Sequence, residues 1–131
     1  MNLFSKLFNN SDTSESVILN DGLKLAMEFG KNWLQPIQDR LKKKYRFLTL
    51  QELNDYDTIC RQAMHKGHDF VYNTLTELYD VNQTISNNEL KEKLKKTLLD
   101  QYPWINTSNL EALFSQSCYY AWKDGLTKCI K

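Results

Sequence analysis

The stretch Tyr45-Arg46-Phe47-Leu48 has a counterpart later in the chain, Tyr102-Pro103-Trp104-Ile105. Past a one-residue slip in the turn, five further residues of the first segment have counterparts in the second: Thr49, Tyr56, Cys60, Ala63 and Gly67 correspond to Thr107, Phe114, Cys118, Ala121 and Gly125. The chain has only three Cys and four Gly, so a shared register for two of each favours a repeat over chance. An internal sequence repeat at a fixed spacing indicates one supersecondary unit used twice.

Apolar residues recur with helical spacing on both sides of each turn, and no segment alternates with a period of two. The spacing predicts helices over residues 21–44, 50–80, 87–101 and 107–129. Short turns make neighbouring helices antiparallel, and two amphipathic hairpins bury their stripes against each other. The sequence therefore predicts an all-α fold, a four-helix bundle of two pseudo-repeated antiparallel hairpins over about 21–80 and 87–129.

Local signals support the expected helix starts and raise two questions inside the helices. Three capping boxes precede helices, at Thr49 with Glu52, Ser86 with Glu89 and Ser108 with Glu111. Pro36 interrupts the first helix, but the apolar stripe keeps its phase across it, which favours a kink over a break. Gly67 either interrupts the second helix or marks a close crossing. A close crossing of the second and fourth helices is favoured, because both carry small residues on equivalent faces: Ala63, Gly67, Ala121 and Gly125.

The N-terminal residues 1–16 are expected to lie apart from a single helical domain over residues 17–131. Four apolar residues form a short amphipathic segment there: Leu3, Phe4, Leu7 and Phe8. This segment either docks on the domain or acts as a weak hook for a membrane surface or a partner. Residues 9–16 are polar and are interpreted as a linker.

Composition narrows the class of protein. A chain of 131 residues is long enough for one domain with its own core. The net charge is +1, and only three of the 17 basic residues are arginine, which argues against nucleic-acid binding. The cysteine count is odd, and neither a secretory leader nor a transmembrane stretch is recognisable. These features predict a cytoplasmic protein with reduced thiols.

The residue types most often used in catalysis gather on the second predicted helix. Four of them are candidates for a metal or thiol site: Cys60, His65, His68 and Asp69. His65 and His68 are three residues apart, close enough to share a metal ion. The alternative is structural, with Cys60 packed as a small apolar residue and a charge ladder formed by Asp57, Arg61, His65 and Asp69. The structural interpretation is preferred, so no catalytic, metal or cofactor site is predicted.

Two groups of basic residues lie near predicted helix ends, and in an up-down bundle both would lie at the same end. The first group contains Arg40, Lys42, Lys43, Lys44 and Arg46, and the second Lys91, Lys93, Lys95 and Lys96. Cations at a helix C-terminus oppose the helix dipole, and nearby acidic residues would neutralise part of both groups. The functional alternatives are an acidic partner, an anionic lipid surface or a nucleic acid.

Aromatic residues crowd one turn of the fourth predicted helix, at Tyr119, Tyr120 and Trp122. They cannot all point inward, and exposed Tyr and Trp are favoured anchors of protein interfaces. We therefore expect a non-enzymatic interaction module, an adaptor or inhibitor. The candidate residues for partner binding all lie on predicted helices: Tyr119, Tyr120, Trp122, Arg40, Lys42, Lys43 and Lys44. The partner is another protein, and a homodimer is left open. The alternative is a small metal- or thiol-dependent enzyme that uses His65, His68 and Cys60.

Overall fold

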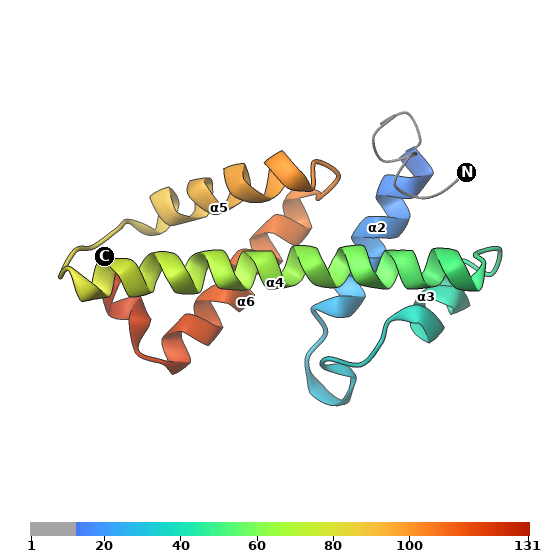
Figure 1. Cartoon of the computed structure of the whole chain (residues 1–131), viewed down its shortest axis with the longest axis horizontal. Helices are drawn as coiled ribbons and strands as arrows, with labels where there is room; N and C mark the ends of the chain where they lie inside the picture. Colours follow the sequence, from blue (N-terminus) through green and yellow to red (C-terminus); the bar gives the residue numbers. More distant parts are fainter. Residues whose placement is uncertain (1–12) are drawn as a thin grey trace. The chain divides into compact units, whose positions relative to one another are not determined.

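The computed structural model describes residues 13–131, and within this range the protein is all-helical, as expected. Its α-helices are α2 (Thr13–Ala26), α3 (Gln38–Lys44), α4 (Leu50–Asp80), α5 (Asn87–Gln101) and α6 (Thr107–Lys123), with short 3₁₀ turns η1 (Gly30–Asn32) and η2 (Leu126–Cys129) (Figure 1). The part of the chain described contains no strand, only an isolated bridge between Ile85 and Ile130. The expected amphipathic segment at Leu3, Phe4, Leu7 and Phe8 lies outside the described residues.

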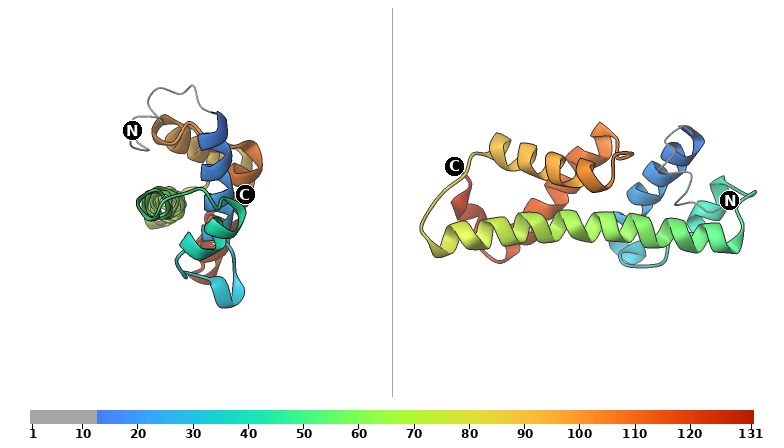
Figure 2. Two further views of the ribbon diagram at one scale, coloured as in Figure 1. Left: turned by 90° about the vertical axis from the view of Figure 1, so that its right-hand side faces the viewer. Right: turned by 45° about the horizontal axis from the view of Figure 1, so that its top comes forward.

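The chain divides into two compact units, Met1–Met64 and His65–Lys131, with the boundary inside α4. The described part of the first unit contains α2, η1, α3 and the first half of α4. The second contains the remainder of α4 with α5, α6 and η2. Helix α4 itself is one uninterrupted helix (Figure 2). Between Thr13 and Lys131, no helix combines the length and apolar character that a bilayer crossing requires.

The continuous, kinked first helix expected over residues 21–44 is wrong, because the chain forms two separate helices. Helix α2 begins at Thr13, before the expected start at residue 21 and inside the expected linker over residues 9–16. It ends at Ala26, well before Pro36, and α3 begins only at Gln38. Between them, Gly30 and Leu34 have positive φ angles of 84° and 65°. Such left-handed residues cannot continue a right-handed helix. The break therefore begins upstream of the proline that suggested a kink.

The expected bounds of the second helix are confirmed by α4. Both halves of its capping box form: Glu52 N–H donates to Thr49 Oγ1 at 3.1 Å, and Thr49 N–H donates to Glu52 Oε1 at 2.9 Å. Gly67 does not interrupt the helix. A Cβ at Gly67 would lie only 2.8 Å from Leu113 Cδ2 of α6, so glycine allows a close approach of the two helices there.

The fourth helix ends earlier than expected. Helix α6 stops at Lys123, and Gly125 follows with a φ angle of 77°. A left-handed glycine just beyond a helix end is a common stop signal. Gly125 therefore ends a helix instead of packing against one, and the expected extension of this helix to residue 129 is wrong.

The capping box at Ser86 is confirmed, since Glu89 N–H donates to Ser86 Oγ at 3.1 Å. The box expected at Ser108 is wrong. Asn106 is the N-cap of α6, and its Oδ1 accepts from Asn109 N–H at 2.8 Å. Asparagine is as good an N-cap as serine, so the earlier residue starts the helix.

Each unit buries its own apolar residues. In the first unit, the fully buried side chains include Leu19, Leu23, Ile37, Leu41, Tyr56 and Met64. In the second they include Leu75, Leu90, Leu94, Leu98 and Leu113. Cys60 is buried as expected, whereas Cys118 is only half-buried. The neighbouring Ser117 is buried.

Candidate functional site

Helix α6 exposes two large aromatic side chains on one face. Trp122 is 62% exposed and Tyr119 is 45% exposed, and their ring centroids are 6.1 Å apart. They are three residues apart, so they lie side by side on the helix surface. The opposite face of α6 is buried at Leu110, Leu113 and Phe114. A helix with one face in the core and two aromatic side chains on the other presents an apolar surface to solvent.

The aromatic contacts continue from this face toward α4. The ring of Tyr120 lies 5.6 Å from that of Tyr119 and 5.1 Å from the imidazole of His68. The ammonium of Lys123 lies 5.8 Å from the centre of the Tyr119 ring, within the range of a cation–π contact. We refer to Tyr119, Tyr120 and Trp122 as the α6 aromatic surface.

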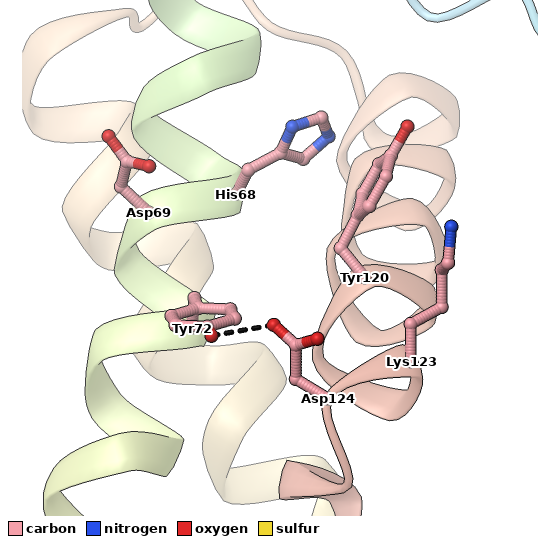
Figure 3. A pocket seen from close by; sticks show the side chains of 6 residues that line it. All are labelled: His68, Asp69, Tyr72, Tyr120, Lys123 and Asp124. Atoms are coloured by element: carbon pink, nitrogen blue, oxygen red, sulfur yellow. Dashed lines mark hydrogen bonds between the residues drawn. The ribbon is translucent and has the colours of Figure 1, made fainter.

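An open pocket of about 340 Å³ adjoins this surface. Helix α4 and the C-terminal end of α6 line it with His68, Asp69, Tyr72, Tyr120, Lys123 and Asp124 (Figure 3). The two walls are joined by a hydrogen bond, in which the hydroxyl of Tyr72 donates to Asp124 Oδ2 at 2.6 Å. We call this cavity the α4–α6 pocket. It presents two phenol groups and an imidazole together with two carboxylates and one ammonium group.

Burial sets the protonation of the imidazole in this pocket. Desolvation lowers the pKa of His68, and the neighbouring His65 lowers it further, while Gln116 and Asp69 act in the opposite direction. His68 Nε2 lies 2.7 Å from Gln116 Oε1. The hydrogen bond from Tyr72 to Asp124 raises the pKa of that phenol. At neutral pH, His68 and Tyr72 are therefore uncharged.

Two of the residues considered for a metal or thiol site, Cys60 and His68, bond to other partners. In the described residues, no group of three or more His, Cys, Asp or Glu side chains lies close enough to hold a metal ion. The His65 and His68 rings are nearly perpendicular, with centroids 6.3 Å apart. Cys60 is buried, and its thiol donates to the Leu19 carbonyl at 3.3 Å. Burial raises the pKa of this thiol, which keeps it protonated.

The first pair of the expected charge ladder on α4, Asp57 with Arg61, forms and has a structural role. Arg61 Nε donates to Asp57 Oδ1 at 3.0 Å. The same carboxylate oxygen accepts from Ile37 N–H at 3.2 Å, and Arg61 also bonds the Gln35 carbonyl. This pair therefore ties the loop before α3 to α4.

The two basic groups are partly neutralised by acidic side chains. In the first group, Arg40 pairs with Glu28, and Lys44 pairs with Asp21 at 2.8 Å. In the second group, Lys91 and Lys95 share Glu111, at 2.8 and 3.7 Å. Lys42 donates to the Leu48 carbonyl instead, at 2.5 Å, and Lys43 is exposed.

The structure brings together residues that the sequence suggested for different purposes. His68 and Asp69, considered for a metal, line the same pocket as Tyr120, considered for a partner. Tyr72, Lys123 and Asp124 were not singled out from the sequence. The only signal for two of them is helical spacing, since Tyr72 follows His68 by four residues and Asp124 follows Tyr120 by four.

No protein-family model, curated protein or solved structure matches the chain. Its function therefore has to be inferred from the side chains and their surroundings.

Proposed function

We propose that this protein is a non-enzymatic interaction module, of the adaptor or inhibitor type, that binds another protein through the α6 aromatic surface and the α4–α6 pocket. The observation that carries the proposal is Trp122, 62% exposed beside an exposed Tyr119. Trp and Tyr dominate the binding energy of protein interfaces because they bury a large area at a small cost in side-chain entropy. The encounter is expected in the cytoplasm.

The pocket supports the same proposal, because it offers a place for one partner side chain next to the aromatic surface. Its walls carry the carboxylates of Asp69 and Asp124 against the single ammonium of Lys123. Phenol rings and carboxylates together favour a cationic side chain. A partner with an apolar contact patch and an adjacent arginine or lysine fits both features.

Affinity capture from the native cell, comparing three forms of the protein, tests this function. We expect wild type to retain a partner that Trp122→Ala loses. Tyr79→Ala is the matched control, because Tyr79 is 54% exposed on α4 in the same unit. With the purified partner, Trp122→Ala should weaken binding about 30-fold or more, a typical effect for a central anchor. Equal binding by Trp122→Ala and wild type would contradict the proposal.

A homodimer is a distinct form of the same proposal. If the partner is a second copy, sedimentation should show self-association that depends on protein concentration and disappears in Trp122→Ala.

The alternative is a small metal- or thiol-dependent enzyme at His65, His68 and Cys60. We do not adopt it, because the Cys60 thiol is buried and protonated and His68 is bonded to Gln116. Stoichiometric metal in the purified protein would bring this alternative forward.

We also propose that the two hairpin turns are copies of one unit, as the internal sequence repeat suggests. Tyr45 and Tyr102 have similar φ and ψ angles, −121° and 72° against −127° and 69°. Each tyrosine packs edge-on against the aromatic residue two positions later, with 6.2 Å between ring centroids. The N-caps Thr49 and Asn106 each lie four residues after the tyrosine, so the two turns share one register without a slip. In that register Cys60 and Gly67 no longer align with Cys118 and Gly125, so the proposed copy is limited to the turns. Superposition of the two hairpins in an experimental structure tests this relation.

A further inference from the structure

The turn between α3 and α4 carries the two most exposed large apolar side chains in the described residues. Phe47 is 74% exposed and Leu50 is 72% exposed. Leu48 between them is 2% exposed, so the turn is anchored by one side chain while its neighbours point to solvent. The Phe47 ring touches only the edge of Tyr45 among the ring contacts described. Both exposed side chains therefore lie at the N-terminal end of α4, where the α3–α4 turn joins it. Figure 1 shows this turn at the end of the long helix.

Basic residues precede and enter this turn in the sequence, although Arg40 and Lys44 among them pair with Glu28 and Asp21. Residues 40–50 contain Arg40, Lys42, Lys43, Lys44 and Arg46 and no acidic residue. Lys42 Nζ donates to the Leu48 carbonyl at 2.5 Å, which holds its charge against the turn. Lys43 and Arg46 are exposed, and neither forms an ion pair with a described residue. We refer to Phe47, Leu50, Lys42, Lys43 and Arg46 as the basic-apolar tip.

The corresponding turn in the second unit lacks both features. Its backbone has the same local geometry, but Trp104 is half-buried where Phe47 is exposed. No lysine or arginine occurs from Thr97 to Thr107, and Asp100 adds a negative charge. The turn geometry alone therefore does not require exposed apolar residues or cations. Their combination is particular to the α3–α4 turn.

We propose that the basic-apolar tip docks on an anionic membrane surface. Phe47 and Leu50 enter the boundary between headgroups and acyl chains, while Lys42, Lys43 and Arg46 lie against lipid phosphates. Membrane association needs two signals acting together, apolar insertion and attraction between cations and anionic headgroups, and the tip supplies both. Apolar side chains as exposed as Phe47 and Leu50 can enter a fluid lipid surface without a preformed pocket to receive them. This second activity is independent of the α6 aromatic surface.

Co-sedimentation of the full chain with lipid vesicles tests the proposal. We expect binding to phosphatidylserine-rich vesicles and little binding to phosphatidylcholine alone. The double variant Phe47→Ser, Leu50→Ser should lose at least about tenfold in affinity, since each side chain buries much of its apolar area on insertion. Lys43→Glu, Arg46→Glu should lose about 25-fold or more at low salt, from about fivefold for each cation removed.

Two controls make the outcome specific to the tip. Tyr79→Ser, Val81→Ser removes two other exposed apolar side chains, 54% and 61% exposed, and should leave vesicle binding unchanged. Phe47→Trp should bind as wild type does, because it keeps an aromatic side chain at the tip. Circular dichroism should show that all variants keep the helical content of wild type.

Three results would overturn the proposal: no binding of wild type to anionic vesicles, equal binding to neutral vesicles, or equal losses in the tip and control variants. If the tip instead serves an acidic protein or a nucleic acid, wild type will fail the first test. Trp122→Ala should bind vesicles normally, so failure here is distinguishable from failure of the proposed protein-binding function.

Discussion

At the scale of single residues, Gly22 and Cys60 decide how closely α2 approaches α4 in the first unit. A Cβ at Gly22 would lie 2.8 Å from Cys60 Sγ and 3.3 Å from Ile37 Cδ1. The thiol is buried and bonded to the Leu19 carbonyl. A side chain that appeared in the sequence as a possible nucleophile thus fills a contact between helices.

Gly22→Ala should destabilise the wild-type fold by about 1 kcal/mol. Overpacking of a core costs about 1–3 kcal/mol, and the better helix propensity of alanine offsets about 1 of it. In a Cys60→Ala background the clash with sulfur is removed, so the same change should become neutral or stabilising. Urea unfolding of the four proteins in the cycle measures this. An equal effect of Gly22→Ala in both backgrounds would show that the close contact is absent.

His68 makes the stability of the fold depend on pH below about 6.5. Burial lowers its pKa below the ordinary value of 6.5, so the unfolded chain binds a proton more readily than the folded one. Its contribution to stability is fully present above about pH 6.5 and is lost as the pH falls toward the lower folded pKa. Burial raises the pKa of Asp21, but Lys44 and Tyr45 lower it, and the net pKa lies below the ordinary 3.8. The stability that this carboxylate contributes is lost only as the pH falls below about 3.8, so its effect does not overlap with that of His68.

We therefore expect the free energy of unfolding to decrease from about pH 7 to about pH 5, and His68→Gln to flatten this slope. His65→Gln, at an exposed position on the same helix, should retain it. Urea titrations at several pH values provide the measurement. A wild-type stability that stays constant or rises over this interval would contradict the burial of His68 as a neutral imidazole.

At the scale of elements, the sequence predicts best where start signals and apolar spacing agree. Helix α4 has both, and its expected bounds hold from Leu50 to Asp80. The prediction of one first helix is wrong because an unbroken apolar stripe does not reveal the backbone φ angles. Leu34 has a left-handed φ of 65°, a conformation that leucine rarely adopts. The predicted ends of α6 are wrong, because Asn106 caps the helix in place of Ser108 and Gly125 stops it.

The start of α6 provides a direct test of this correction. Asn106→Ala should cost about 1 kcal/mol of stability, because Asn109 N–H loses its side-chain acceptor. Ser108→Ala should be neutral within about 0.5 kcal/mol, since Ser108 lies inside the helix and is exposed. Thermal or urea unfolding of the two variants distinguishes the caps. The reverse order of effects would restore the capping box at Ser108.

At the scale of the whole molecule, the two candidate surfaces belong to different compact units. The basic-apolar tip lies in Met1–Met64, and the α6 aromatic surface and the α4–α6 pocket lie in His65–Lys131. Each can therefore be changed without altering the other. The sequence suggested Tyr119, Tyr120 and Trp122 because they crowd one helical turn. It could not suggest the pocket, whose walls come from α4 and α6 and meet only through tertiary packing.

Site-specific photocrosslinking in the native cell tests the central claim, that the α6 aromatic surface binds another protein, most directly. A photoreactive phenylalanine analogue would replace Trp122, Tyr119 or, as the control, Tyr79. We predict one common protein adduct from positions 119 and 122 and none of that adduct from position 79. Absence of an adduct at both α6 positions, or the same adducts at all three, would contradict the claim.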